Sequence, residues 1–172
     1  MKMKKGAIWV STVLYVLISL TILSVVFSVV KPKIDEARDR AIVEQSIIML
    51  NDLDNAVKLA SQSTGTQLKR EVKISNGDLF FNTRNGMNNV TFILKQTNLK
   101  YSEIDSEITS GNLAILTKKS AQESGKYDLY ITLKIDISGK EIYSEISQLS
   151  PSPFPYSVFI KNNGTHINFY KQ

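Results

Sequence analysis

The chain contains no cysteine among its 172 residues, and its only histidine is His166. The absence of cysteine excludes disulfide scaffolds, zinc sites built from thiolates and thiol chemistry. The sequence also lacks a glycine-rich phosphate loop, a nucleophile elbow and a histidine-based metal motif. A single histidine with polar neighbours on a predicted terminal strand indicates a surface side chain rather than a catalytic base. We therefore expect no enzymatic activity, with no catalytic residue, cofactor or metal.

One acidic pattern offers an alternative to this expectation. Glu103, Asp105 and Glu107 recur at every second position, so they could line one face of a strand and recruit calcium. A solvated loop or an edge strand explains the same spacing without a ligand, and we favour that interpretation.

Positive charge is concentrated at the start of the chain. The sequence has 21 lysines and arginines against 16 acidic residues, a formal net charge of +5, and Lys2, Lys4 and Lys5 lie within the first six positions. Removal of residues 1–6 would leave 18 basic side chains against 16 acidic ones. Because no basic stripe interleaved with aromatic residues follows, we expect no nucleic-acid partner.

Long hydrophobic runs are confined to the first thirty residues. Ala7 to Val30 is a run of 24 residues without a charge or a proline. As a helix it would be about 36 Å long, which exceeds a hydrocarbon layer of about 30 Å. The lysines before it favour a cytoplasmic N-terminus, although Lys31 and Lys33 follow it. The run is too long for an ordinary cleaved secretory signal, and a plain signal anchor stays an alternative.

A short basic motif lies directly before this apolar run. Lys4, Lys5, Gly6 and Ala7 precede it, and this arrangement resembles the class III, or type IV prepilin, signal peptide of archaeal pilins. The resemblance implies that a membrane aspartyl peptidase cuts after Gly6 while the hydrophobic helix is retained. A residue without a side chain suits this role because it lets the backbone extend into the peptidase.

The resemblance covers about the first sixty residues. Residues 31–45 are similar to the segment that follows the membrane helix in many archaeal pilin-like proteins. Bacterial pilins usually carry a glutamate five residues into the mature chain, where this sequence has Ser11. Archaeal subunits generally lack that glutamate, so the departure argues against a bacterial-type pilin.

The resemblance implies a structural subunit of an archaeal surface filament. The subunit would form a homo-oligomer through Ala7–Val30, with a prepilin peptidase and the pilus assembly machinery as further partners. It would lie in the cell membrane before assembly and in an extracellular filament afterwards, with its β-domain exposed for adhesion or surface contact. A single-pass membrane protein with a ligand-binding extracellular domain is the alternative, and an archaellin is the second. The implied organisation is a leader (1–6), a transmembrane or filament-core helix (7–30), an amphipathic helix (31–64) and an extracellular all-β domain (65–172).

A helical period continues beyond the apolar run, from Ile34 to about Ser61. Pro32 lacks a backbone N–H and predicts a kink or a break, and Gly65 is expected to end the helix. The apolar face would pack on the chain's own β-domain, on neighbouring subunits, or on both. That face comprises Ile42, Met49, Leu53, Ala56 and Ala60, widened by Ile48, Leu50, Val57 and Leu59. The predicted polar face comprises Arg40, Glu44, Asn51, Asp54, Asn55 and Lys58.

After Gly65 the hydrophobic period changes to two, which predicts strands. Asn76-Gly77 predicts a hairpin turn, and Asn162-Asn163-Gly164 predicts another. The proline-rich stretch from Pro151 to Pro155 predicts a loop that crosses between sheets. Seven or eight short strands indicate an antiparallel β-sandwich or a barrel-like sheet, and an α+β fold for the whole chain. The predicted strands are 68–74, 79–81, 90–94, 114–117, 127–135, 141–146, 156–161 and 165–170.

Two sequons lie in the region expected outside the cell. They are Asn89-Val90-Thr91 and Asn163-Gly164-Thr165. Both asparagines are candidates for N-glycosylation, although Asn163 is equally explained by the turn that an Asn-Gly pair forms.

Overall fold

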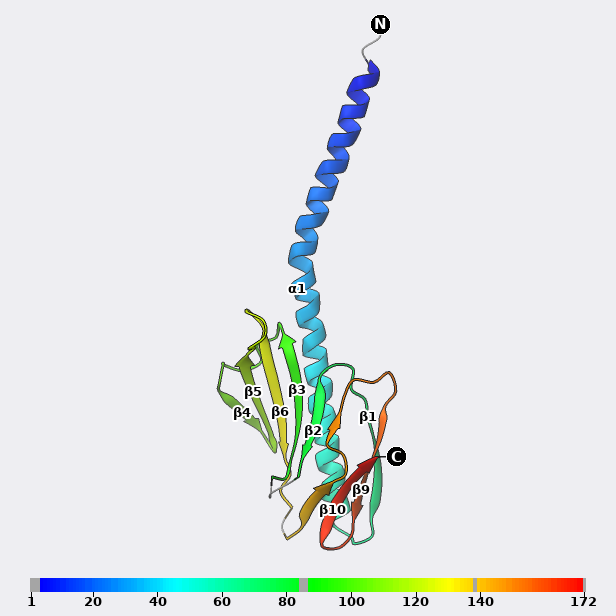
Figure 1. The fold of residues 1–172 in the computed structure, drawn as a ribbon, viewed down its shortest axis with the longest axis vertical. Coiled ribbons are helices and arrows are strands. Elements are labelled where there is room, and N and C mark those ends of the chain that lie inside the picture. The colour runs from blue at the N-terminus through cyan, green and yellow to red at the C-terminus, as the bar shows by residue number, and fades with distance from the viewer. Residues whose placement is uncertain (1–3, 84–86, 138, 172) are drawn as a thin grey trace. The chain divides into compact units, whose positions relative to one another are not determined.

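A computed structural model describes residues 4–83, 87–137 and 139–171. One long helix, α1 (Lys4–Ser61), precedes two β-sheets (Figure 1). Helix α1 continues through Pro32 without a break. Of the two alternatives predicted at this proline, a kink or a break, the break is therefore wrong. A proline removes one helical hydrogen bond, and the turns on either side keep theirs. The kink stays a prediction.

The chain forms two compact units, the first ending at Arg38 and the second beginning at Asp39. The second unit contains the C-terminal part of α1 and both sheets, and its strands confirm the predicted α+β, antiparallel-rich fold. A four-stranded sheet has the order β1 (Gln67–Val72), β9 (Tyr156–Asn162), β10 (His166–Lys171) and β7 (Glu141–Ser144). A six-stranded sheet has the order β4 (Glu107–Ser110), β5 (Leu113–Lys119), β6 (Tyr127–Lys134), β3 (Asn89–Thr97), β2 (Asp78–Asn82) and β8 (Gln148–Leu149). Every pairing between these strands is antiparallel except that of β7 with β10.

The hairpin predicted at Asn76-Gly77 is wrong. β1 pairs with β9 and β2 pairs with β3 and β8, so the turn carries the chain from one sheet to the other. Gly77 has a φ of +82°. An Asn-Gly pair in a sequence indicates a residue with this left-handed backbone conformation. That local signal does not say which sheet the next strand joins. The hairpin of β9 and β10 is confirmed, as is the proline-rich loop from Pro151 to Pro155 between strands of different sheets.

The C-terminal part of α1 forms one hydrophobic core with strands of both sheets. This confirms that the amphipathic face packs on the chain's own β-domain. Two predicted members of that face are wrong, because Ile48 and Leu59 are 69% and 50% exposed. Val43 and Asp54 are buried in their place, so the buried stripe is rotated from the predicted one. The helical residues in the core are Ile42, Val43, Leu50, Leu53, Ala56, Val57 and Ala60.

Candidate functional site

The exposed apolar surface of α1 between Trp9 and Val30 is the strongest candidate for a functional surface. Its large apolar side chains are all exposed, with Trp9 at 77%. The most apolar stretch of the helix is exposed along its whole length. By length and composition, it can span a membrane. An apolar surface of this extent needs a cover, which lipid or another protein can provide.

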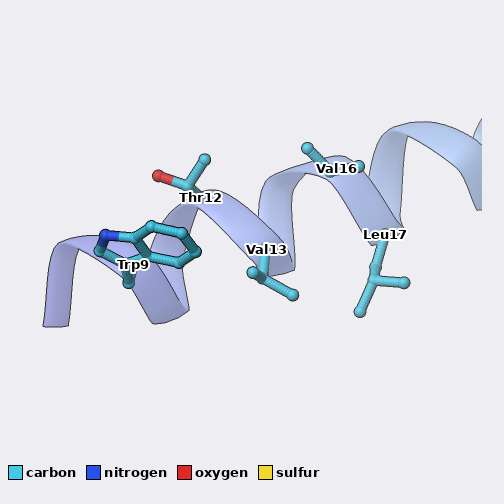
Figure 2. Close-up of a pocket in the computed structure, with 5 residues that line it drawn as sticks. All are labelled: Trp9, Thr12, Val13, Val16 and Leu17. Atoms are coloured by element: carbon cyan, nitrogen blue, oxygen red, sulfur yellow. The ribbon is translucent and has the colours of Figure 1, made fainter. Parts of the chain in front are cut away.

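The first turns of this segment form a shallow apolar hollow along one helix. Val13 and Leu17 project from one side of the helix, and Thr12 and Val16 from the other (Figure 2). Together with Trp9 they line a space of about 450 Å³. Four of the five lining side chains are apolar. This surface is therefore suited to contact with hydrocarbon groups, from a lipid chain or from a second helix.

Three hydroxyl groups in the apolar segment bond to their own helix. Thr21 Oγ1 donates to the Leu17 carbonyl (2.8 Å), Ser24 Oγ to the Leu20 carbonyl (2.9 Å) and Ser28 Oγ to the Ser24 carbonyl (2.8 Å). These bonds satisfy the hydroxyl donors inside one chain. These three hydroxyl donors therefore keep a hydrogen-bond acceptor whether lipid or another protein surrounds the segment.

The structure places the predicted processing residues in the first turns of α1. Lys4, Lys5, Gly6 and Ala7 have helical backbone, and their side chains lie outside the described part. Met1 to Met3 lie outside the described residues altogether. Gly6 thus lies on the same helix as the exposed apolar surface, three residues before Trp9.

Polar contacts fasten the end of α1 to the β-domain. Asn162 is fully buried on β9, and its Nδ2 donates to the carbonyls of Ala60 (2.8 Å) and Ser63 (3.0 Å). Its Oδ1 accepts from the Gly164 N–H at 2.8 Å. Lys140 Nζ donates to the Ser61 carbonyl at 2.8 Å. The donors to Ala60 and Ser61 satisfy carbonyls that the end of a helix otherwise leaves unpaired.

Two acidic side chains tie earlier turns of α1 to the six-stranded sheet. Asp39 Oδ2 accepts from Thr97 Oγ1 (2.6 Å) and from the Asn98 N–H (3.1 Å). Asp54, predicted on the polar face, is buried and accepts from Lys58 Nζ (2.6 Å) and from Asn112 Nδ2 (3.3 Å). Sequence patterns do not predict these two roles, because the sheet-side partners, Thr97 and Asn98 for Asp39 and Asn112 for Asp54, are distant in sequence.

The predicted acidic pattern is divided between a loop and an edge strand. Glu103 pairs with Lys100 (2.8 Å), and Glu107 on β4 pairs with Lys134 (2.9 Å). Asp105 lies in the loop before β4, with a φ of +58°. Across the described residues, no group of three acidic or histidine side chains has a geometry that could hold a metal ion. The interpretation as a loop and an edge strand is confirmed.

His166 lies half-buried on β10, next to an exposed tyrosine of β7. The two rings of His166 and Tyr143 meet edge to face, with centroids 5.1 Å apart. The Tyr143 hydroxyl donates to Glu141 Oε2 at 2.5 Å. That hydrogen bond, together with the negative charge of Glu141, raises the pKa of the Tyr143 phenol above its ordinary value. The Tyr143 side chain is exposed, and we assign it no catalytic part.

The two sequons lie in contrasting surroundings. Asn89 is paired in β3 between β2 and β6, and its Oδ1 accepts from Asn82 Nδ2 at 3.0 Å. The hydroxyl of the same sequon, on Thr91, is buried and lies 3.2 Å from Thr132 Oγ1. Asn163 is exposed in the turn between β9 and β10. Of the two asparagines, Asn163 is therefore the more accessible, because Asn89 is half-buried in a paired strand.

No family model, curated protein or solved structure matches this chain. The long apolar N-terminal helix followed by a β-rich domain is compatible with a pilin-like layout.

Proposed function

We propose that this chain is a structural subunit of an archaeal type IV pilus-like surface filament. In this proposal a prepilin peptidase cuts after Gly6, and Ala7–Val30 assembles with the same segment of other copies. The β-domain remains exposed for adhesion or surface contact. The observation that carries the proposal is a helix with an exposed apolar surface, which follows a basic leader directly and continues into the core of a β-domain. The role is structural and uses no catalytic residue.

The exposed apolar segment accounts for both stages of this role. Helices that are apolar on all sides must be covered by lipid or by one another. Before assembly, lipid would surround Ala7–Val30, and in the filament sister helices would replace the lipid. The hydroxyls of Thr21, Ser24 and Ser28 donate hydrogen bonds within their own helix. They therefore need no further acceptor from the lipid or from a sister helix. Small side chains at these positions also allow helices to approach closely.

Processing at Gly6 is the first step to test. We expect mass spectrometry of the cell-surface protein to show a chain that begins at Ala7. Replacement of Gly6 by leucine should block the cut, because the peptidase no longer meets a residue without a side chain. Met3→Leu, in the same leader, is the matched control and should be processed normally. An intact Met1–Gly6 in the mature surface protein would refute the proposal.

The same variant separates the proposed function from the alternatives. If the chain is a non-polymerising anchor with a ligand-binding domain, Gly6→Leu should leave its surface display unchanged and no filament should exist in either form. If the proposal holds, sheared surface filaments should contain the wild-type protein and be absent from Gly6→Leu cells. Electron microscopy of those filaments, with mass spectrometry of their protein, also distinguishes a pilus from an archaellum.

A further inference from the structure

Three asparagines of this chain are followed directly by glycine, at Asn76, Asn85 and Asn163. Such a pair is prone to deamidation, because the nitrogen of a glycine, which carries no side chain, can approach and attack the asparagine side chain. Asn85 lies outside the described residues. The other two asparagines are exposed, and the structure places them in different hydrogen-bonding environments. Their reactivities can therefore be compared.

At Asn76 the attacking and the attacked groups already face one another. The Gly77 N–H donates to Asn76 Oδ1 at 2.9 Å. Asn76 Cγ is bonded to that oxygen, so the nitrogen lies beside the carbon that it would attack. Groups that the fold holds this close react without first being brought together. Because Asn76 is exposed, the water and the base that the reaction needs can reach it.

At Asn163 both groups are engaged elsewhere. The Gly164 N–H donates at 2.8 Å to Oδ1 of Asn162, whose side chain is buried. Asn163 Nδ2 lies 3.0 Å from His166 Nε2, and the Asn163 backbone N–H donates to the His166 carbonyl at 2.9 Å. Attack by the Gly164 nitrogen first requires the loss of its hydrogen bond to Asn162, which costs free energy. This turn therefore protects Asn163.

We propose that Asn76 is a site of spontaneous deamidation in the folded protein, and that Asn163 is protected from the same reaction. The Gly77 nitrogen forms a bond to Asn76 Cγ, and Cγ releases its own nitrogen as ammonia, which carries away the Gly77 proton. Water then adds to either carbonyl of the cyclic imide and leaves aspartate or isoaspartate. Water is the one co-reactant, and no group is oxidised or reduced. The reaction is the same in a filament subunit and in a plain membrane anchor.

The isoaspartate product changes the turn between the two sheets. It routes the main chain through the former side chain of Asn76 and adds one methylene group directly before Gly77. The space around that glycine is already filled, since a Cβ on it would lie 2.6 Å from the Ile93 carbonyl oxygen and 2.7 Å from Phe92 Cζ. We therefore expect the lengthened turn to lose its close contact with β3, so that old molecules are less stable than new ones.

Site-resolved mass spectrometry of the full-length protein in detergent tests the inference. Trypsin cuts after Lys73, Arg84 and Lys161, so the three Asn-Gly pairs fall in separate peptides. In mildly alkaline buffer, Asn76 should be converted to acid at least about tenfold faster than Asn163, which corresponds to one hydrogen bond of about 1.4 kcal/mol. Labelling by an isoaspartyl methyltransferase should appear in the peptide with Asn76. Equal rates in the folded protein, or a faster reaction at Asn163, would overturn the inference.

Unfolding in urea is the control for intrinsic reactivity. Both asparagines precede glycine, so their rates should become comparable once the fold no longer holds them. A tenfold difference that persists in urea would show that the folded structure is not its cause, and would also overturn the inference. This comparison uses the wild-type chain and needs no variant to fold.

A variant of the protecting residue gives a second test in the folded protein. Asn162→Ala removes the acceptor of the Gly164 N–H. It should raise the deamidation rate at Asn163 and leave the rate at Asn76 unchanged, which serves as the reference within the same sample. An unchanged rate at Asn163 would contradict the protection that we assign to Asn162.

Discussion

Replacement of Asn162 tests whether one buried amide fastens the end of α1 to the β-domain. The side chain is fully buried, donates to the carbonyls of Ala60 and Ser63, and accepts from the Gly164 N–H. Asn162→Ala leaves the Ala60 carbonyl and the Gly164 N–H without this partner, whereas the Ser63 carbonyl keeps the Thr66 N–H as a donor at 3.3 Å. Each buried group left unpaired costs about 1–3 kcal/mol. Because the turn beside these groups is exposed, we take the lower end for each group and expect a loss of about 2 kcal/mol in the free energy of unfolding.

The neighbouring asparagine provides the matched control. Asn163 is exposed, so Asn163→Ala should change the free energy of unfolding by less than about 0.5 kcal/mol. Both full-length variants would be made in a bacterial host and unfolded with urea in detergent, with near-ultraviolet circular dichroism as the signal. Hydrogen exchange of peptides that cover residues 58–66 gives a local readout. Asn162→Ala should accelerate exchange there, while Asn163→Ala should not.

A size-conserving variant tests the cause. Asn162→Asp keeps the shape but replaces the donor with a carboxylate that faces the carbonyls of Ala60 and Ser63. It should be at least as destabilising as Asn162→Ala, since a buried charge without a donor partner is costly. The reasoning is refuted if Asn162→Ala unfolds with the same free energy as Asn163→Ala, or if Asn162→Asp is the mildest of the three.

Two further predictions use pairs of matched positions. Gly77 and Gly125 share a φ of +82°, but a Cβ on Gly77 would lie 2.6 Å from the Ile93 carbonyl oxygen, whereas a Cβ on Gly125 meets nothing within 4 Å. Gly125→Ala should cost about 1–2 kcal/mol from the left-handed backbone alone, and urea unfolding should show a clearly larger cost for Gly77→Ala. If the protein is glycosylated after folding, Asn163→Gln should remove glycan mass from the surface protein and Asn89→Gln should not. A mass change with Asn89→Gln would contradict the difference in accessibility.

Local periodicity was sufficient to predict the long helix and most of the strands. The alternation of residues 127–135 and the Asn-Gly turn before β10 depend on neighbours close in sequence, and both predictions are confirmed. The turn at Asn76-Gly77 was read correctly as a turn but wrongly as a hairpin. Its φ is a local property, whereas the choice of β9 as the partner of β1 depends on a strand more than eighty residues away.

The buried face of the helix likewise depends on contacts with residues distant in sequence, which local periodicity does not predict. Ile48 and Leu59 have the apolar character of core residues, yet the two sheets cover a different stripe. Asp54 has the character of a surface residue, but Asn112 and Lys58 supply its hydrogen bonds in the buried position.

The part of α1 that enters the β-domain is a component of its core rather than a tether to it. Tension applied to the apolar segment would therefore reach the domain through Leu50, Leu53 and Val57, which are held among strands of both sheets. If the helix were pulled out, the core would lose these side chains and the domain would unfold. A soluble fragment that begins at Gly65 would lack this interior wall, so any mechanical or truncation experiment must retain the chain from Asp39 onward.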